Sequence, residues 1–172
     1  MLKRIDTNRF HEGIDGSVIR DKYNLGKAPL VLYVGRISPH KGVHLLLEAF
    51  NLTRQRFPGA KLMIVGEHTF GAYSNRLRKM SDASVIFTGL VSDEELPNYY
   101  AACDLYATCT LWEGFDLPLA EAQACGKPVV AFDIGPHREV VDKRGLLVKA
   151  GDVVEFGKQV AAMLAILEGA RN

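Results

Sequence analysis

The chain has 172 residues, 48% of them hydrophobic, and its 21 basic and 20 acidic side chains give a formal net charge of +1. A chain of this length suits one domain with a substantial buried core. The balanced charge gives no electrostatic reason to expect nucleic acid or an anionic membrane as a partner. A phosphate-containing ligand would therefore depend on a few placed side chains.

Residues 1–28 are polar with scattered hydrophobic side chains, and we expect them to form a lead-in segment that docks on a domain spanning 29–172. Lys3, Arg4 and Asp6 lie where a secretory signal would be apolar, and no run of about 18 apolar residues occurs. The sequence therefore predicts a cytoplasmic protein without a transmembrane segment.

From Pro29 onward, short runs rich in Val, Ile and Leu alternate with helix-patterned stretches, which is typical of repeated βα units. Strands covered on both faces are almost wholly apolar, and this description fits residues 30–34, 61–65, 85–89, 104–108, 128–132 and 145–149. We expect an α/β fold, a Rossmann-like, doubly wound parallel sheet of about six strands. Ligands of such folds lie beyond the carboxyl ends of the strands.

Helix signals separate these strands. A helix predicted over residues 41–57 has apolar residues at helical spacing from Val43 and ends before Pro58 and Gly59. A second is predicted from Ser92, which has capping-box spacing to Glu95, with a bend at Pro97.

Two further helices are predicted nearer the C-terminus. One has Pro118 in its first turn and closes at Gly126. The last follows Asp152, which repeats the capping spacing to Glu155.

Several common motifs are missing. The segment "GRISPHKG" after the first strand matches neither G-x-G-x-x-G nor a Walker loop, and the sequence contains no Asp-x-Asp pair. Three cysteines without C-x-x-C spacing favour buried reduced thiols, namely Cys103, Cys109 and Cys125. The histidine spacing predicts no metal site for His11, His40, His44, His68 or His137.

A candidate anion site follows the first strand. Gly35 and Arg36 leave the strand, and Lys41 and Gly42 open the next helix. Two cations and helix-end amides at one place favour a phosphate, although two solvated surface charges would fit the same pattern.

A second candidate site is the segment "EGFDLPLAE". Glu113 lies on a loop and Glu121 about one turn into the following helix, so both carboxylates can face the strand ends. A carboxylate with two acceptor oxygens matches adjacent sugar hydroxyls, and the loop amides suit a polar ligand. The alternative is an ordinary loop carboxylate and an exposed helix residue.

Several ordered motifs together resemble the C-terminal half of the retaining nucleotide-sugar glycosyltransferases of family 4, also called group 1, which have the GT-B fold. The resemblance covers nearly the whole chain and rests on "YVGRISPHKGVHLLLEAF", "LMIVGE", "FTGLVSDEELPNYYAACDLYATCT", "EGFDLPLAEAQACGKPVVAFDIG" and "GLLVKAGD". It implies a donor-binding domain that holds a nucleoside-diphosphate sugar.

The resemblance also implies residue roles. Arg36 and Lys41 would contact the donor diphosphate and stabilise it as it leaves, without a metal ion or other cofactor. Glu121 would hold the ribose, and Glu113 would hold the transferred sugar, so Arg36, Lys41 and Glu113 are the catalytic candidates. The other implied donor-binding residues are Gly35, Gly89, Leu90, Val91, Phe115, Asp116 and Leu117, of which the last three act through their amides and 89–91 meet the base.

Two departures from the family pattern matter. The family usually has glycine where Asp116 stands, which bears on the sugar contact. Residues 4–13, "RIDTNRFHEG", resemble the linker that follows an N-terminal acceptor-binding half, and that half is not in this sequence. Its partner would be the same enzyme's other domain or a separate chain.

Two other classes of protein remain open. A nucleotide-sugar-binding module that does not catalyse, or that needs a separate partner domain, would keep the same motifs. An unrelated dehydrogenase or signalling domain of the same fold is disfavoured by the missing glycine fingerprint and leaves the paired glutamates unexplained. The sequence does not identify the base, the sugar or the acceptor.

Overall fold

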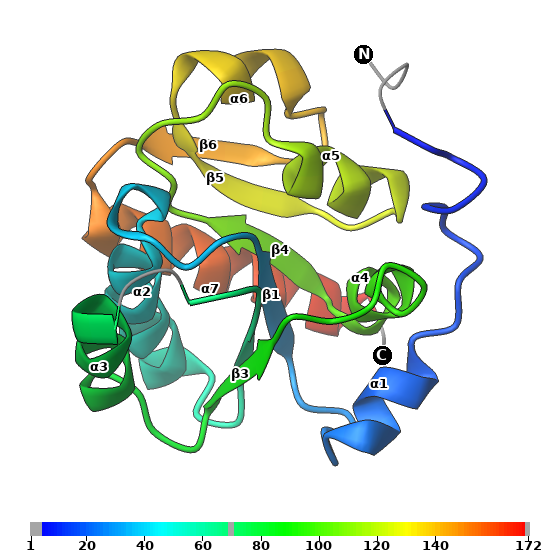
Figure 1. The fold of residues 1–172 in the computed structure, drawn as a ribbon, viewed down its shortest axis with the longest axis horizontal. Coiled ribbons are helices and arrows are strands. Elements are labelled where there is room, and N and C mark those ends of the chain that lie inside the picture. Colours follow the sequence, from blue (N-terminus) through cyan, green and yellow to red (C-terminus); the bar gives the residue numbers. More distant parts are fainter. Residues whose placement is uncertain (1–4, 69–70, 171–172) are drawn as a thin grey trace.

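The computed structural model describes residues 5–68 and 71–170, which form one parallel sheet with helices on both faces (Figure 1). The six strands are β1 Leu30–Val34, β2 Lys61–Val65, β3 Val85–Gly89, β4 Leu105–Thr108, β5 Val129–Asp133 and β6 Leu146–Lys149. The predicted fold class and all six strands are confirmed. The first residues of the last three strands each differ by one position, and β5 also ends one residue later than predicted.

The strand order is β3-β2-β1-β4-β5-β6, and every neighbouring pair is parallel. The chain runs outward from β1 to β3, then returns to place β4 on the other side of β1. Doubly wound sheets bind ligands where the order reverses in this way. The carboxyl ends of β1 and β4 therefore mark the expected site.

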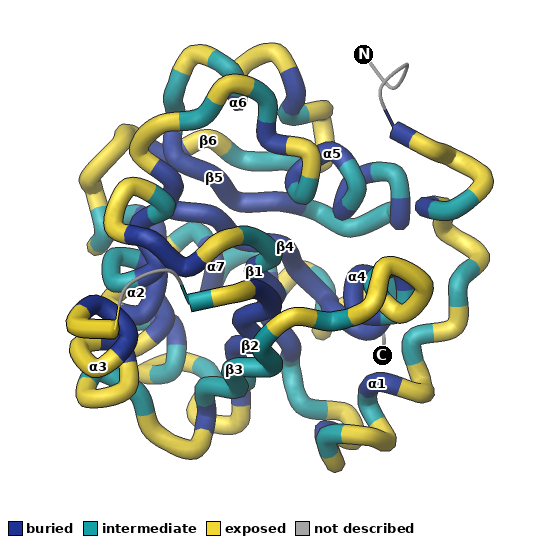
Figure 2. The backbone as a smooth tube through the Cα atoms, in the orientation of Figure 1, coloured by how far each residue is buried: buried dark blue, intermediate teal, exposed yellow. Residues whose placement is uncertain are grey.

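Helices α2 Val43–Arg56, α3 Gly71–Lys79 and α7 Val153–Gly169 cover one face of the sheet. The other face carries α1 Ser17–Lys22, α4 Leu96–Ala102, α5 Leu117–Ala124 and α6 Gly135–Val140. Side chains alternate between the two cores along each strand, as the period of a β-strand requires, so Val31 packs on the first face and Leu32 on the second. Figure 2 shows that the four inner strands, β2, β1, β4 and β5, are almost continuously buried, whereas the edge strands β3 and β6 are partly exposed.

The lead-in segment packs against the α4 side of the molecule. Ile5, Phe10, Ile19 and Leu25 are buried in the second core. Arg20 of α1 pairs with Asp104 at 3.1 Å and donates to the carbonyl of Ala102 at 2.9 Å. The segment is thereby joined to the strand β4 region.

One predicted helix begins at the wrong residue. The second helix, α4, starts at Leu96 instead of Ser92, so Pro97 lies in its first turn, where it causes no bend. The Ser92 hydroxyl does accept the amide of Glu95 at 3.2 Å, but this contact closes the turn before the helix.

Three helices lie outside the sequence predictions: α1, α3 and α6. Two of them, α1 and α6, have only six residues, too short for a clear apolar period. The short 3-10 helix η2 Pro39–Lys41 precedes α2. No helix within the described ranges is long and apolar enough to cross a membrane.

The three cysteines are buried free thiols, as predicted. Burial raises the pKa of the Cys125 thiol to about 11 and that of the Cys103 thiol to about 12. Both thiols are therefore protonated at neutral pH, and they act as small apolar side chains.

Candidate functional site at the carboxyl ends of the strands

Two adjoining cavities open at the carboxyl ends of β1 to β4, and they share Val34 and Gly35. The larger, of about 250 Å³, is lined by Val34, Gly35, Arg36, Val65, Gly66, Glu67, Leu90, Val91, Asp93 and Leu96. The smaller, of about 30 Å³, is lined by Tyr33, Val34, Gly35, Lys41, Tyr106, Thr108, Thr110, Glu113, Asp116 and Pro118. Seven of the predicted site residues thus surround one place: Gly35, Arg36, Lys41, Leu90, Val91, Glu113 and Asp116.

Two glycines let the connections at this edge approach one another. Gly42 has φ +64°, and a Cβ there would lie 2.0 Å from the carbonyl oxygen of Cys109. Gly66 has φ +146°, and its Cβ would lie 1.9 Å from the carbonyl oxygen of Gly35. Only glycine accommodates both the backbone conformation and the contact at these positions.

The two cations of the β1–α2 connection have different surroundings. Arg36 is exposed and its side chain borders the larger cavity. Lys41 forms an ion pair with Glu113 across the smaller cavity, and both side chains are less than one-fifth exposed. The motif residues predicted for the diphosphate and for the sugar are therefore in direct contact.

Three amides around the start of α2, where the sequence predicted an anion site, already have acceptors within the protein. The amide of Lys41 donates to Ser38 at 3.0 Å, and that of Gly42 donates to Pro39 at 3.0 Å. The amide of His44 donates to the hydroxyl of Tyr73 on α3 at 3.1 Å. These three amides are not free for an anion, and the side chains of Arg36 and Lys41 supply the positive charge here.

Two amides of the loop before α5 also donate to acceptors within the loop. The amide of Leu117 donates to the carbonyl of Phe115 at 3.0 Å, and that of Gly114 to the carboxylate of Glu113 at 3.2 Å. The sequence predicted sugar contacts from the amides of Phe115, Asp116 and Leu117. The structure shows that the Leu117 amide already has an acceptor.

The Asp116 side chain is a structural group. It is 4% exposed and caps α5 by accepting the amide of Leu119 at 3.1 Å, while its other oxygen lies 3.1 Å from Nε2 of His137. A carboxylate at this position is also stabilised by the positive end of the helix dipole.

Glu121 lies outside both cavities, in a partly buried position on α5. Its carboxylate accepts a hydrogen bond from the hydroxyl of Tyr100 on α4 at 2.7 Å. Burial raises the pKa of Glu121, and the charges of Asp116 and Asp93 add to the rise, against the hydrogen bond from Tyr100 and the charge of Arg9. From the sequence we predicted that this carboxylate faces the strand ends, and nothing in the sequence indicated the contact with Tyr100.

The predicted base-contact residues follow β3. Gly89 is the last residue of that strand, and its carbonyl accepts the amide of Gly66 at 3.0 Å. Leu90 is 72% exposed, and together with Val91 it lines the larger cavity. An exposed leucine at a cavity wall can pack against the flat face of a base.

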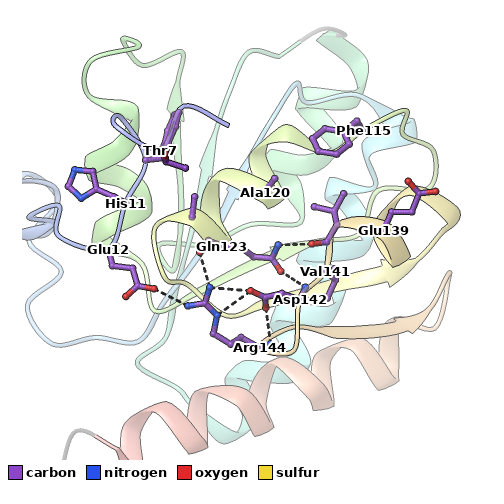
Figure 3. A pocket seen from close by; sticks show the side chains of 13 residues that line it. Thr7, His11, Glu12, Phe115, Ala120, Gln123, Glu139, Val141, Asp142 and Arg144 are labelled. Carbon is purple, nitrogen blue, oxygen red and sulfur yellow. Dashed lines mark hydrogen bonds and ion pairs between the residues drawn. The ribbon is translucent and has the colours of Figure 1, made fainter. Parts of the chain in front are cut away.

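A larger cavity, of about 600 Å³, lies elsewhere, between the lead-in segment and α5 and α6 (Figure 3). Phe115 borders it, with Phe10, Ala124 and Val141, and the ion pair of Arg144 and Glu12 stands at its edge. Arg36, Lys41 and Glu113 do not line it. The residues with the predicted chemistry surround the two smaller cavities instead.

Sequence reasoning missed several residues at the site. Thr108 ends β4 and Thr110 lies two residues beyond it, and both line the smaller cavity. Glu67 and Asp93 line the larger one. The position of Thr108 and Thr110 at the end of a predicted strand was the available signal for them. Glu67 and Asp93 are exposed acidic side chains with no distinguishing pattern.

The fold and this site define the class of protein as a Rossmann-like domain with two adjoining cavities at the switch point between β1 and β4. A family model described as glycosyl transferases group 1 matches residues 28–165. The chain belongs to the group 1 glycosyltransferases.

Among curated relatives, the chain is 35% identical over 176 residues to a GDP-mannose-dependent alpha-(1-6)-phosphatidylinositol monomannoside mannosyltransferase of Mycolicibacterium smegmatis. That match covers 94% of this chain and 45% of the relative. The chain thus spans about half the length of the curated relatives it matches.

Solved structures of glycosyltransferases have the same fold as this chain. HepE of Anabaena, in complex with UDP and glucose, has a TM-score of 0.81 and 31% identity, over 94% of this chain and 45% of HepE. A C-terminal domain of the group 1 glycosyltransferase LpcC from Francisella tularensis has a TM-score of 0.75 and 27% identity, over 96% of this chain and 88% of that domain. The fold and family agree with the resemblance stated from the sequence motifs.

Proposed function

We propose that this chain is the donor-binding domain of a retaining glycosyltransferase that transfers a sugar from a nucleoside-diphosphate sugar to an acceptor. The observation that carries the proposal is the convergence of Arg36, Lys41 and Glu113 around two adjoining cavities at the switch point of the sheet. Relatives whose names include GDP-mannose, and a similar structure in complex with UDP and glucose, support this ligand class.

The proposed placement follows the two cavities. The nucleoside would occupy the larger one, beside Leu90 and Val91, with Glu121 at the ribose beyond its edge. The diphosphate would lie at Gly35 between Arg36 and Lys41, and the sugar would lie toward Glu113. Arg can hold two phosphate oxygens at once, and Lys adds a point charge.

In the transfer step, the bond between the anomeric carbon and the diphosphate oxygen breaks, and negative charge develops on the leaving diphosphate. Arg36 and Lys41 stabilise that charge in place, which is the largest contribution this domain can make to the rate. The acceptor hydroxyl oxygen forms the new bond to the anomeric carbon with retention, and its proton passes to the leaving diphosphate oxygen.

The acceptor site would belong to an N-terminal half, in the same enzyme or on a partner chain. The matched relatives are about twice as long as this chain, which supports the existence of such a half. We propose a cytoplasmic location, which is supported by three cysteines that remain free thiols.

Calorimetry with UDP, GDP and ADP, and with their sugar conjugates, tests the proposed function. We expect one nucleoside diphosphate to bind and its sugar conjugate to bind more tightly. If none of the six compounds binds, the proposal is contradicted.

Donor binding is also expected to survive EDTA. A strict requirement for magnesium or manganese would show that the charge balance described here is wrong.

The alternative is a binding module that does not catalyse. It is favoured by the contact between Lys41 and Glu113, which leaves the two ligand groups paired with each other when no donor is bound. Joining an N-terminal half from a relative tests this alternative. Transfer by the joined protein, lost on Glu113→Gln, supports the enzyme, whereas donor binding without transfer supports the module.

A further inference from the structure

His137 of α6 is wholly buried and lies against the start of α5. Its Nδ1 lies 2.7 Å from the carbonyl oxygen of Phe132, and its Nε2 lies 3.1 Å from Oδ2 of Asp116. The other Asp116 oxygen accepts the amide of Leu119. A continuous chain of polar contacts therefore runs from β5 through His137 to the first turn of α5.

The protons of this chain can be placed from the partners alone. A carbonyl oxygen only accepts, so Nδ1 of His137 must carry a hydrogen. One further proton must lie between Nε2 and the carboxylate. The pair is therefore either an imidazolium with a carboxylate or a neutral imidazole with a carboxylic acid, and its net charge is zero in both cases.

The charged arrangement is favoured at Asp116. Its carboxylate accepts a main-chain amide and lies at the N-terminus of α5, and both features stabilise the ionised form.

We propose that His137 is a positioning residue for the donor site: as an imidazolium it neutralises Asp116 and holds the first turn of α5 in place. The functional part of this inference rests on the proposed donor binding. Asp116 lines the same cavity as Lys41 and Glu113, so without His137 an uncompensated negative charge would face the position of the diphosphate.

The neighbouring charges make this compensation important. Lys41 is already paired with Glu113, and Glu121 is a second carboxylate on α5. The titratable groups around the pair come from several other elements and include Tyr33 of β1, Tyr106 of β4, Tyr100 of α4, Glu121 of α5, Asp133 of β5, and Lys41 and Glu113 across the cavity. The tyrosines are neutral at pH 7, Glu113 is paired with Lys41, and Asp133 is paired with Arg138. Among the described residues, a bare Asp116 would therefore add a negative charge with no cation beside it to balance it.

Nitrogen NMR of the histidine rings tests the protonation state without any ligand, with the His137 signal assigned by its loss in His137→Gln. We expect both ring nitrogens of His137 to stay protonated through neutral pH, whereas a solvated histidine loses a proton near pH 6.5. A signal from an unprotonated Nε2 at pH 7 would overturn the proposal. This outcome is independent of donor binding.

Titrations with UDP and GDP test the consequence for the site. We expect His137→Gln to lower the affinity for the nucleoside diphosphate that binds, by about tenfold. This is the effect of one unit charge about 12 Å away at an effective dielectric constant of ~20. Adding Asp116→Asn should recover most of that loss, because asparagine keeps an oxygen for the Leu119 amide and removes the charge.

Gln123→Leu serves as the control. Gln123 is another buried polar residue of α5, which donates to the carbonyl of Val140 at 2.8 Å and accepts the amide of Asp142 at 2.8 Å. Gln123→Leu should lower the urea midpoint of unfolding, and adding Asp116→Asn to it should restore neither stability nor binding.

The double variant of His137 and Asp116 decides the proposal. If it binds as weakly as His137→Gln alone, His137 has only a packing role and the proposal fails. If His137→Gln does not fold, folding of the double variant supports the proposal, and failure of both to fold contradicts it.

Discussion

The β1–α2 and β4–α5 connections occupy equivalent places in the topology but differ in their chemistry. Each leaves a strand at the switch point and starts a helix at the same edge of the sheet. The start of α2 follows a glycine and is closed by a hydroxyl from a neighbouring helix, that of Tyr73. The start of α5 is closed by its own buried carboxylate, Asp116.

The difference shows where the charge of the site comes from. Several amides at each helix start already have acceptors within the protein, so fewer remain for a ligand than at the helix ends that commonly bind anions. The β1–α2 connection contributes Arg36 and Lys41, whereas the β4–α5 connection contributes Glu113 and a carboxylate whose charge is balanced internally. Ligand binding here should therefore respond to side-chain changes more than to helix position.

The largest expected effect comes from separating the two connections. Gly42→Ala would place a Cβ against the Cys109 carbonyl in a left-handed conformation, and we expect a loss of about 2–4 kcal/mol in unfolding free energy. Urea unfolding measures this loss. Gly59→Ala is the control, because Gly59 has open space around its Cα and should change stability little. Equal behaviour of the two variants would contradict the close approach of the connections.

The cations should be next in effect. We expect Arg36→Ala or Lys41→Ala to weaken nucleoside diphosphate binding by about 1.5–3 kcal/mol, because each loses a hydrogen bond to a charged group. Calorimetry gives the affinities, with circular dichroism to confirm the fold. Lys61→Ala, at the opposite edge of the sheet, should bind normally. Unchanged affinity in both site variants would remove the diphosphate assignment.

Glu121 connects α5 to α4 and should affect binding and pH dependence separately. We expect Glu121→Gln to weaken nucleoside diphosphate binding by about 1 kcal/mol, because an amide offers one acceptor where a ribose diol needs two. Titration calorimetry at neutral pH measures the affinity.

The same variant should also change how the unfolding free energy depends on pH, and here the charged form of Glu121 opposes folding. Burial raises the folded pKa of Glu121 above its ordinary 4.5, so the folded state binds more protons than the unfolded state in that interval. Stability contributed by this group is present below pH 4.5 and is lost as pH rises through the folded pKa. Urea unfolding from pH 4 to 8 should show this loss in the original protein, and a smaller one in Glu121→Gln. Identical pH profiles would contradict the effect of burial.

The smallest effect should come from the ion pair that joins the connections. We expect Glu113→Gln to release Lys41 and to strengthen binding of the bare nucleoside diphosphate by about 0.5 kcal/mol, because partly exposed pairs contribute little. The additional affinity of the sugar conjugate should fall. Paired titrations with the nucleoside diphosphate and its sugar conjugate measure both changes, and equal changes for the two ligands would contradict a contact between Glu113 and the sugar.

Much of the architecture could be predicted because it depends on local patterns. Strands buried on both faces are nearly continuous apolar runs, so segments such as "LVLYV" identify β1 and its neighbours. The order of Gly35, Arg36 and Lys41 after that strand places two cations at one edge, and the structure brings them to adjoining cavities.

Contacts between segments far apart in the sequence could not be predicted. Nothing near Tyr73 indicates that its hydroxyl would close the start of α2, and nothing near Tyr100 indicates a bond to Glu121. The position of Asp116 as a cap could be read from its spacing to Leu119, but its pairing with His137 depends on how α6 packs. Short helices such as α6 lack the length that periodicity needs.

The buried contact between Asp116 and His137 also has an evolutionary consequence. Losing one member of such a pair leaves an unpaired charge in the interior, whereas losing both at once is nearly neutral. Substitution at either position should therefore be rare in isolation, and the two positions should change together among relatives. Relatives with glycine at the position of Asp116 are expected to have a residue other than histidine at the position of His137.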